Sequence, residues 1–410
     1  MSLILNEGKS PIPGKNAFYI SRRVLRVVLL AACVLTGSVM LAQSTGSSDA
    51  SQTTEARLKS SGWWPTKVDR SRNEYVGAAV CADCHAAESK TFQSSAMAHA
   101  ATRAASSDSL RDHDHLAFQI GRYNYQISHL DGKNVLRISE GGASYSAVLL
   151  WAFGMGRMAQ TYVYEKNGNF YEAHLSYYTA LGALDITPGH PRTQPPSLVE
   201  GAGRPVPIDE IRRCFECHTT ASTTANRFNP QAAVLGVSCE ACHGPGAAHV
   251  AAIKSGKFDL AAASIVNPAA LTPAKSVDFC GSCHRTWQDV VSDSPTRYAE
   301  LNVRFAPYRL QNSRCWKDGK EDARITCITC HNPHQPLVED PASYDSACLQ
   351  CHVAAGTSAK NSSDDHRTAC SVGVKLCVTC HMPKFRNPVL HFAFTDHWIR
   401  IAAPGAMLPD

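Results

Sequence analysis

Apolar and polar residues alternate along the stretch between residues 110 and 180. The apolar positions are Phe118, Ile120, Tyr123, Tyr125, Ile127, Val135, Leu136 and Ile138. A period of two residues predicts strands with one buried face. Two later apolar runs flank Lys166-Asn167-Gly168-Asn169, and Asn-Gly between strands is typical of a tight hairpin because both residues tolerate positive φ. We therefore predict a small antiparallel sheet, followed by a Pro-rich linker from Pro188 to Pro207.

A second apolar run, from Val24 to Ala42, follows a basic N-terminal region. Basic residues, then apolar residues, then a small residue at the break form the order of an export signal. Residues 1–42 are therefore predicted to be a signal peptide cleaved near Ala42. The main alternative is an uncleaved membrane anchor through residues 24–42, because the run approaches the length that spans a bilayer. Leu30-Ala31-Ala32-Cys33 resembles a lipoprotein cleavage box, which is less favoured because apolar sequence continues past the cysteine.

Seven Cys-x-x-Cys pairs take up 14 of the 17 cysteines, and each pair is followed at once by histidine. The motifs are Cys81/Cys84/His85, Cys214/Cys217/His218, Cys239/Cys242/His243, Cys280/Cys283/His284, Cys327/Cys330/His331, Cys348/Cys351/His352 and Cys377/Cys380/His381. Two thiols at this spacing can add to the two vinyl groups of one haem, and the next residue then points its imidazole at the iron. The motifs therefore predict seven covalently attached haem c groups, each with its motif histidine as proximal iron ligand.

Zinc ribbons and disulfides are alternative uses of Cys-x-x-Cys. Zinc knuckles do not require histidine at the next position, and disulfides do not require this spacing. With 18 histidines in 410 residues, chance placement after all seven pairs has a probability on the order of 10^-9 to 10^-10, which favours haem. Cys315 and Cys370 lie outside the motifs. In an oxidising compartment they suggest a disulfide, with two separate buried thiols as the alternative.

The last six motifs lie within residues 214–381, at 28 residues per haem. So few residues cannot build a conventional two-layer core, so the porphyrins are expected to serve as core. The predicted fold class is a mainly α and irregular multihaem cytochrome, with the small β-sheet inserted between haem 1 and haem 2. An Ala-rich stretch, residues 86–105, is expected to be helical. The predicted divisions are a signal or anchor (1–42), a flexible lead (43–74), a first haem segment (75–109), a β-rich insert with its linker (110–213) and a hexahaem region (214–410).

The net charge of the sequence is +5, but the cofactors change its sign. Removing residues 1–42 leaves about +1, and seven haems add fourteen propionates, which brings the holoprotein to about −6 when oxidised and about −13 when reduced. The slightly basic sequence therefore gives no support for a nucleic-acid partner.

Short motifs around these sites resemble one family. They include Tyr75-Val76-Gly77, Phe92-x-x-Ser95-x-Met97, Phe153-Gly154-x-Gly156, Tyr177-Tyr178, Pro188-Gly189-His190, His243-Gly244-Pro245-Gly246-x-x-His249, Tyr308-Arg309-Leu310-Gln311-x-Ser313-Arg314-Cys315, His331-Asn332-Pro333-His334, Cys380-His381-Met382-Pro383-Lys384 and Asp396-His397-Trp398-Ile399-Arg400. Over residues 75–400 the chain resembles the multihaem c-type cytochromes related to the tetrahaem cytochrome c and hydroxylamine oxidoreductase, with doubled Cys-x-x-Cys-His motifs. The resemblance implies electron transfer and mostly bis-histidine haems, without fixing a substrate. All seven motifs end in histidine, whereas pentahaem nitrite reductases use Cys-x-x-Cys-Lys at the catalytic haem, which counts against that activity.

Eleven further histidines are available as distal ligands. His249 follows His243 by six residues and His334 follows His331 by three, too few to wrap both faces of one haem. Each is therefore expected to reach a neighbouring haem. A second group of predicted metal ligands comprises His99, His190, His366, His391 and His397, and the alternative for each is a surface or hydrogen-bonded histidine. Met97 is an alternative to His99 as ligand, although a packed core methionine is favoured.

The leading hypothesis is a carrier in the periplasm, or otherwise outside the cytoplasm, that passes electrons along stacked haems. Its expected partners are other cytochromes or a membrane quinol dehydrogenase. One alternative is an oxidoreductase in which a five-coordinate haem acts on a small nitrogen or sulfur compound, with His174 or Tyr178 nearby. Another is a subunit of an oligomer or haem filament. The basic residues from Arg304 to Arg314 are expected either to line haem propionates or to form a solvated face, and no catalytic residue is assigned.

Overall fold

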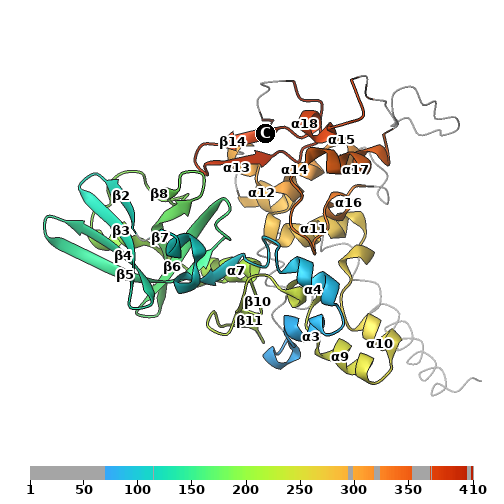
Figure 1. Ribbon diagram of the computed structural model, residues 1–410, viewed down its shortest axis with the longest axis horizontal. Helices are drawn as coiled ribbons and strands as arrows, with labels where there is room; N and C mark the ends of the chain where they lie inside the picture. The colour runs from blue at the N-terminus through green and yellow to red at the C-terminus, as the bar shows by residue number, and fades with distance from the viewer. Residues whose placement is uncertain are drawn as a thin grey trace, which may run out of the picture. The chain divides into compact units, whose positions relative to one another are not determined.

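The computed structural model describes residues 70–113, 115–293, 299–317, 324–352, 370, 372–403 and 408–409. These residues all belong to one compact unit, Ala50–Asp410. The predictions for residues 1–42, for most of the lead and for His366 lie outside the described residues. The described α-helices are short (Figure 1): α3 (Ala78–Ala82), α4 (Ala86–Phe92), α5 (Asp108–Arg111), α6 (Leu198–Ala202), α7 (Ile208–His218), α8 (Cys239–His243), α9 (Ala247–Lys254), α10 (Phe258–Ala263), α11 (Pro273–His284), α12 (Trp287–Asp293), α13 (Ala299–Asn302), α14 (Ala306–Gln311), α15 (Arg314–Lys317), α16 (Cys327–Cys330), α17 (Asp345–Leu349) and α18 (Cys377–His381).

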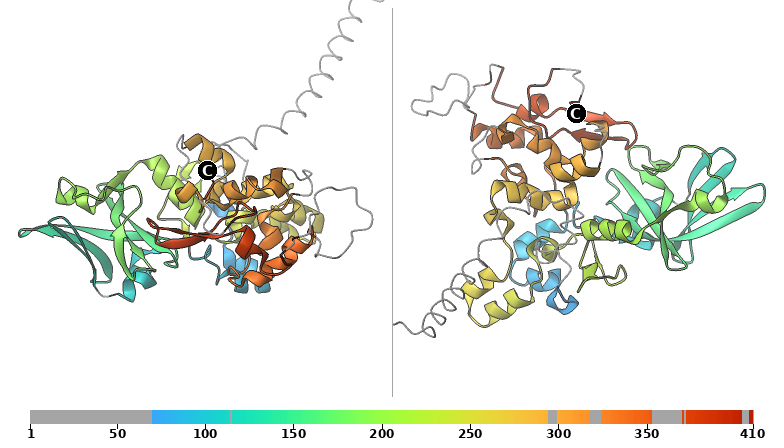
Figure 2. Two further views of the ribbon diagram at one scale, coloured as in Figure 1. Left: turned by 90° about the horizontal axis from the view of Figure 1, so that it is seen from above. Right: turned by 180° about the vertical axis from the view of Figure 1, so that it is seen from behind.

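The largest β structure is a nine-stranded antiparallel sheet, whose curvature can be followed in Figure 2. Its strands are β1 (Ala101–Arg103), β2 (Leu116–Ile120), β3 (Tyr123–Leu130), β4 (Lys133–Glu140), β5 (Ala143–Phe153), β6 (Ala159–Lys166), β7 (Asn169–Tyr178), β8 (Ala183–Ile186) and β9 (Gly203–Val206). Strands β2 to β8 follow one another in chain order, while β1 pairs with β5 and β9 pairs with β7. Because β2 and β8 also contact each other, the sheet is nearly closed.

The sheet is larger than the small one predicted for residues 110–180. Strand β1 lies inside the Ala-rich stretch that was expected to be helical, of which Ala86–Phe92 is an α-helix. Strand β9 lies inside the predicted Pro-rich linker. It packs closely on β7, because a Cβ atom on Gly203 would stand 2.1 Å from the Glu172 carbonyl oxygen. The prediction of a small sheet was therefore wrong, because strands of three or four residues are too short to display a period of two.

The alternation predicted burial correctly at most of its positions, whereas Phe118 and Val135 are only partly buried. Tyr123, Tyr125 and Ile127 on β3 and Leu136 and Ile138 on β4 are buried in the main apolar cluster. The predicted hairpin is also confirmed: Lys166 pairs with Asn169, and the two turn residues have φ of 52° and 77°. Positive φ at both central positions is the geometry that matches the twist of paired strands.

The helical part, by contrast, has little apolar core of its own among the described residues. Its buried cluster consists of Val277, Leu310 and Trp316. Another cluster joins the sheet to α7, where the Phe215 ring meets the Trp151 ring edge-on at 5.3 Å. The remaining β structure consists of three short pairs: β10 (Thr219–Thr220) with β13 (Val234–Leu235), β11 (Thr223–Thr224) with β12 (Arg227–Phe228), and β14 (Lys384–Asn387) with β15 (Phe392–Thr395). Within the described ranges, no helix combines the length and apolar character needed to cross a bilayer.

Candidate haem-binding sites

The Cys-x-x-Cys-His motifs lie on or at the ends of short helices. Residues three and four apart share one helix face, so a single turn points both thiols and the following imidazole to the same side. In the first motif the His85 amide donates to the Cys81 carbonyl at 2.9 Å, and His331 and Cys327 form the same bond in the fifth. The helices concerned are α3, α7, α8, α11, α16, α17 and α18.

Several motif side chains lie at the surface of the polypeptide. Cys84, the second thiol of the first motif, is exposed, and so is His352 at the end of the sixth motif. The physical reason is that α3 and α17 are single turns, and a single turn packs one side against the chain and leaves the other side to solvent. The roles of Cys84 in thioether attachment and of His352 in iron ligation stay predictions. The other second cysteines that are exposed are Cys283, Cys330, Cys351 and Cys380.

Three motif histidines bond a backbone carbonyl through Nδ1. The acceptors are the oxygens of Ala100 for His218 (2.9 Å), Val266 for His243 (2.7 Å) and Arg400 for His381 (3.0 Å). Such a bond fixes the ring orientation and leaves Nε2 as the ligand atom. Burial lowers the pKa of several motif histidines and so favours the neutral ring that a metal requires; these are His218, His243, His284 and His331.

Two predicted distal histidines lie opposite motif histidines. The ring centroids of His243 and His334 are 6.0 Å apart with planes 9° from parallel, and those of His331 and His397 are 6.2 Å apart. An imidazole nitrogen lies about 2 Å from the metal that it binds, and the ring centroid lies about 1 Å beyond that nitrogen. Two imidazoles on opposite sides of one iron therefore have their centroids about 6 Å apart. The centroid separations of both pairs match this distance.

His397 is also held through Nδ1, which bonds the Thr395 carbonyl at 3.0 Å. Burial, with a smaller contribution from His331, lowers the pKa of His397 to about 4. His249 on α9 bonds the Ala261 carbonyl through Nδ1 at 2.9 Å, the same arrangement as in the motif histidines.

The other predicted distal ligands have different surroundings. His190 Nε2 lies 3.2 Å from a Glu172 carboxylate oxygen, and His391 Nε2 lies 2.8 Å from Asp185. His99 Nε2 bonds the Gln93 carbonyl at 2.7 Å. The roles of these three as ligands stay predictions.

Thiols of different motifs lie against one another. Four pairs of thiols are near enough for one to shift the pKa of the other: Cys81 and Cys239, Cys217 and Cys283, Cys280 and Cys327, and Cys348 and Cys377. Two further groups are close enough to interact electrostatically: Cys242 with Cys280 and Cys283, and Cys330 with Cys348. With the motifs numbered in chain order, these contacts form the series 1-3-4-5-6-7, with motif 2 beside motif 4.

Buried carboxylates join neighbouring motifs, a role that the sequence analysis missed. Glu240, inside the third motif, accepts from the amides of Val76 (2.8 Å), Gly77 (2.9 Å) and Gly246 (2.9 Å). It thereby ties the start of α3, which carries the first motif, to α8. An acidic residue between two haem cysteines was the available signal, but its partners in the first segment lie 163 and 164 positions away in the chain.

Asp345, just before the sixth motif, forms a second such link. Its carboxylate accepts from the amides of Leu376 at 2.7 Å and Cys377 at 2.8 Å, at the start of α18. These bonds lower the pKa of Asp345 and keep it charged. The sixth and seventh motifs are thus held together by backbone donors and one carboxylate.

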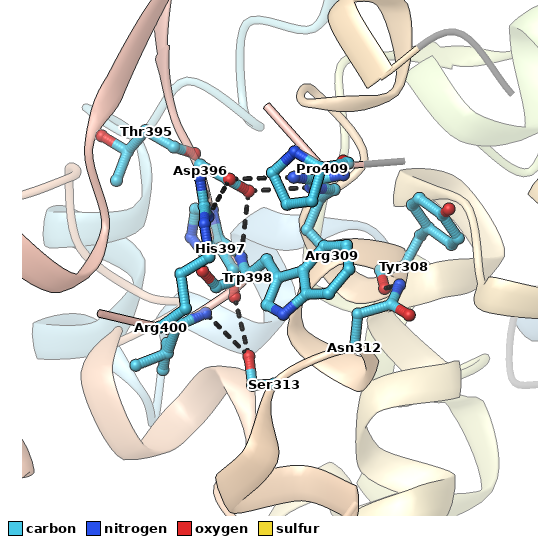
Figure 3. Close-up of polar contacts among 11 residues, drawn as sticks. Tyr308, Arg309, Asn312, Ser313, Thr395, Asp396, His397, Trp398, Arg400 and Pro409 are labelled. Atoms are coloured by element: carbon cyan, nitrogen blue, oxygen red, sulfur yellow. Dashed lines mark hydrogen bonds and ion pairs between the residues drawn. The ribbon is translucent and has the colours of Figure 1, made fainter. Parts of the chain in front are cut away.

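Arg309, within the basic stretch, is fully buried rather than solvated or open to a propionate. Its Nε and Nη2 donate to the two carboxylate oxygens of Asp396 at 2.8 and 2.9 Å, and both side chains are 0% exposed (Figure 3). Burial raises the pKa of Asp396, but the bonds from Arg309, Trp398 and Arg400 outweigh it, and the net pKa lies below the usual range. For Arg309, both sequence-based expectations were wrong.

The expected disulfide between Cys315 and Cys370 is not formed, because both are free thiols. Cys315 lies on α15 close to Cys348 and Cys351 of the sixth motif. Burial raises the pKa of Cys315, whereas backbone amides of Val372 and Gly373 lower that of Cys370. The two thiols therefore have separate surroundings.

The known proteins to which this chain is similar are cytochromes. Residues 199–244, which contain the second and third motifs, match the family described as Cytochrome c554 and c-prime. Multiheme cytochrome MtrA of Shewanella baltica (strain OS185) is 24% identical over 34% of this chain and 52% of its own length, so the chain spans about half the length of that relative. The crystal structure of Outer Cell Wall Cytochrome OcwA is similar with a TM-score of 0.44 and 16% identity, covering 80% of each chain. With the seven motifs, the family match and the similarity to MtrA support haem binding; the narrower resemblance to the tetrahaem and hydroxylamine oxidoreductase group stays a prediction.

Proposed function

We propose that this chain is an exported electron carrier with seven covalently bound haems in a connected series. The observation that carries the proposal is the run of neighbouring thiols that links all seven motifs. Haems attached at neighbouring cysteines would be held close to one another. When bound, the haems supply reversible exchange between Fe(II) and Fe(III).

The described residues leave apolar surface where porphyrins would sit. Four apolar side chains within or directly beside the motifs are 36–46% exposed: Val80, Ile328, Leu349 and Leu376. The buried apolar cluster of the helical part contains only three residues. Covering such side chains with a large aromatic ring stabilises the folded protein by about 25 cal/mol for each Å² of apolar surface removed from water. This supports our proposal that the haems act as the core of this part.

We assign the seven motif histidines as proximal ligands and His334 and His397 as distal ligands. His334 would serve the haem of the third motif and His397 that of the fifth, so each crosses from one motif to another, as the short spacing of His334 led us to expect. His249 is proposed as a further distal ligand, since its Nδ1 bond to Ala261 leaves Nε2 for iron. His99, His190, His366 and His391 remain candidates for the other haems. The alternative for His190 and His391 is pairing of their Nε2 atoms with the carboxylates of Glu172 and Asp185.

Residues 1–42 are proposed to export the chain, either as a cleaved signal or as an anchor through residues 24–42. The order of basic and apolar residues supports this. We propose other cytochromes or a membrane quinol dehydrogenase as electron donors and acceptors. The anionic charge that the propionates give the holoprotein would favour partners with a positive surface.

The proposal is tested on the purified holoprotein. A pyridine haemochrome assay should return about seven haems per chain, and reductive titration should take up about seven electrons. Electron paramagnetic resonance of the oxidised protein should show low-spin ferric haems. A value near four haems contradicts the motif assignment. A high-spin haem that turns over a small nitrogen or sulfur compound contradicts the carrier and supports an enzyme.

A further inference from the structure

The Arg309–Asp396 pair joins α14 to the segment that follows β15 (Figure 3). Asp396 directly precedes His397, whose ring stands 6.2 Å from His331. The guanidinium also donates through Nη1 to the Pro409 carbonyl at 2.8 Å and lies 5.0 Å from the centroid of the Trp398 ring. Arg309 thus contacts both the turn at residues 396–398 and the segment at Pro409.

The turn that carries His397 is held at both ends by side chains. On one side the Asp396 carboxylate accepts from the Trp398 amide at 3.0 Å and from Arg400. On the other side Ser313 Oγ donates to the His397 carbonyl at 3.2 Å and accepts from the Ile399 amide at 2.8 Å. Both anchors, Arg309 and Ser313, come from the chain around α14, so the position of His397 is set by residues more than 80 positions away.

We propose that Arg309, acting through Asp396 and together with Ser313, is the positioning residue that presents His397 as sixth ligand to the haem at Cys327, Cys330 and His331. The inference rests on the proposed bis-histidine ligation of that haem. The physical reason is the bidentate geometry: two parallel N–H···O bonds fix the orientation of a carboxylate as well as its place, and the carboxylate in turn bonds the amide directly after His397.

Rigidity of this turn matters because a ligand competes with solvent for iron. An imidazole held in bonding geometry loses no conformational freedom when it binds, whereas a mobile one does. Without Arg309, the Asp396 charge would remain buried with a single cationic partner, Arg400, and the turn would rearrange to reach water. His397 would then leave the iron while the thioethers and His331 stay in place.

The test compares oxidised holoproteins by electron paramagnetic resonance at low temperature. His397→Ala should convert one haem per chain from low-spin to high-spin, and added imidazole should reverse this. Arg309→Gln should produce the same high-spin signal with the same reversal, at a haem content of about seven. Arg122→Gln, which breaks an ion pair with Glu140 on the sheet, is the matched control and should keep the wild-type spectrum.

The outcomes separate the inference from the proposed function. If His397→Ala leaves every haem low-spin, the ligand assignment fails. If His397→Ala is high-spin while Arg309→Gln keeps the wild-type spectrum, only the positioning role is overturned, and the pair is merely a stabilising contact. Should Arg309→Gln yield no holoprotein, Ser313→Ala decides, because it removes one hydroxyl and no charge. A shifted low-spin signal from one haem supports the inference, and an unchanged spectrum overturns it.

Discussion

The ring centroids of His243 and His334 lie 6.0 Å apart with nearly parallel planes, although His243 belongs to the third motif and His334 follows the fifth, 91 positions later. His334 stands three residues after His331 and yet reaches the third motif rather than its own. Under the proposed ligation, one short stretch of chain would tie two haems together. Each iron would then contribute to the packing of the protein as well as to its redox chemistry.

We predict that His334→Ala makes the haem of the third motif five-coordinate. The reason is that the centroid of the His334 ring lies 6.0 Å from that of the His243 ring, the proposed proximal ligand. Electron paramagnetic resonance should show one high-spin haem per chain, which added imidazole returns to low spin. His129→Ala, at an exposed histidine bonded to Asn134 on the sheet, is the control and should leave the spectrum unchanged. An unchanged spectrum for His334→Ala would remove this residue from the ligand set.

Glu240→Gln should weaken the link between the first and third motifs. The carboxylate accepts three amide protons, and an amide group offers one fewer acceptor oxygen and no charge. The free energy of unfolding should fall by about 2 kcal/mol, measured by guanidinium denaturation of the holoprotein. Glu88→Gln, at an exposed glutamate on α4, should change it by less than about 0.5 kcal/mol. Equal effects of the two substitutions would contradict the proposed link.

Gly236→Ala should be far more harmful than Gly256→Ala. Both glycines have positive φ, of 78° and 69°, so both substitutions cost about 1 kcal/mol of backbone strain. At residue 236 a Cβ atom would also stand 2.0 Å from the Ala98 carbonyl oxygen, whereas nothing lies within 4 Å at residue 256. Thermal unfolding should therefore show a further loss of about 2 kcal/mol for Gly236→Ala. Matching melting temperatures would mean that the segment after the first motif does not pack here.

His174 should make the sheet sensitive to acid. Burial, with a smaller contribution from His190, lowers the pKa of His174 from 6.5 to about 4. The unfolded chain therefore binds a proton at His174 more tightly than the folded chain does. The free energy of unfolding keeps its full value above pH 6.5 and decreases as the pH falls towards 4. The full effect is about 3 kcal/mol.

His174→Asn removes this titration and should flatten the pH dependence of the unfolding free energy between pH 4 and 6.5, measured by urea denaturation. Asparagine can still donate to the Pro191 carbonyl that the ring contacts, so the slope is altered with little change in hydrogen bonding. His129→Asn should keep the wild-type slope. A wild-type slope for His174→Asn would place the acid sensitivity elsewhere.

Local patterns predicted the parts of the fold that depend on neighbouring residues. The alternation at Tyr123, Tyr125 and Ile127 matches buried positions on β3, because a strand exposes alternate side chains to one face. The Asn167-Gly168 turn formed as expected, because its φ values depend on those two residues alone. Strands β1 and β9 were missed since they are too short to show a period, and they exist because β5 and β7 offer them unpaired edges.

By itself the sequence predicted seven haem motifs with their proximal histidines, because thioether attachment requires only the spacing of five consecutive residues. It also indicated that His334 would serve a neighbouring haem. Only the tertiary structure decided which motifs adjoin, that His334 meets His243 and His397 meets His331, and that Arg309 is buried against Asp396. The two histidine pairs and the Arg309–Asp396 pair join residues 66 to 91 positions apart. All of these relationships arise from how the chain packs as a whole, which no local pattern encodes.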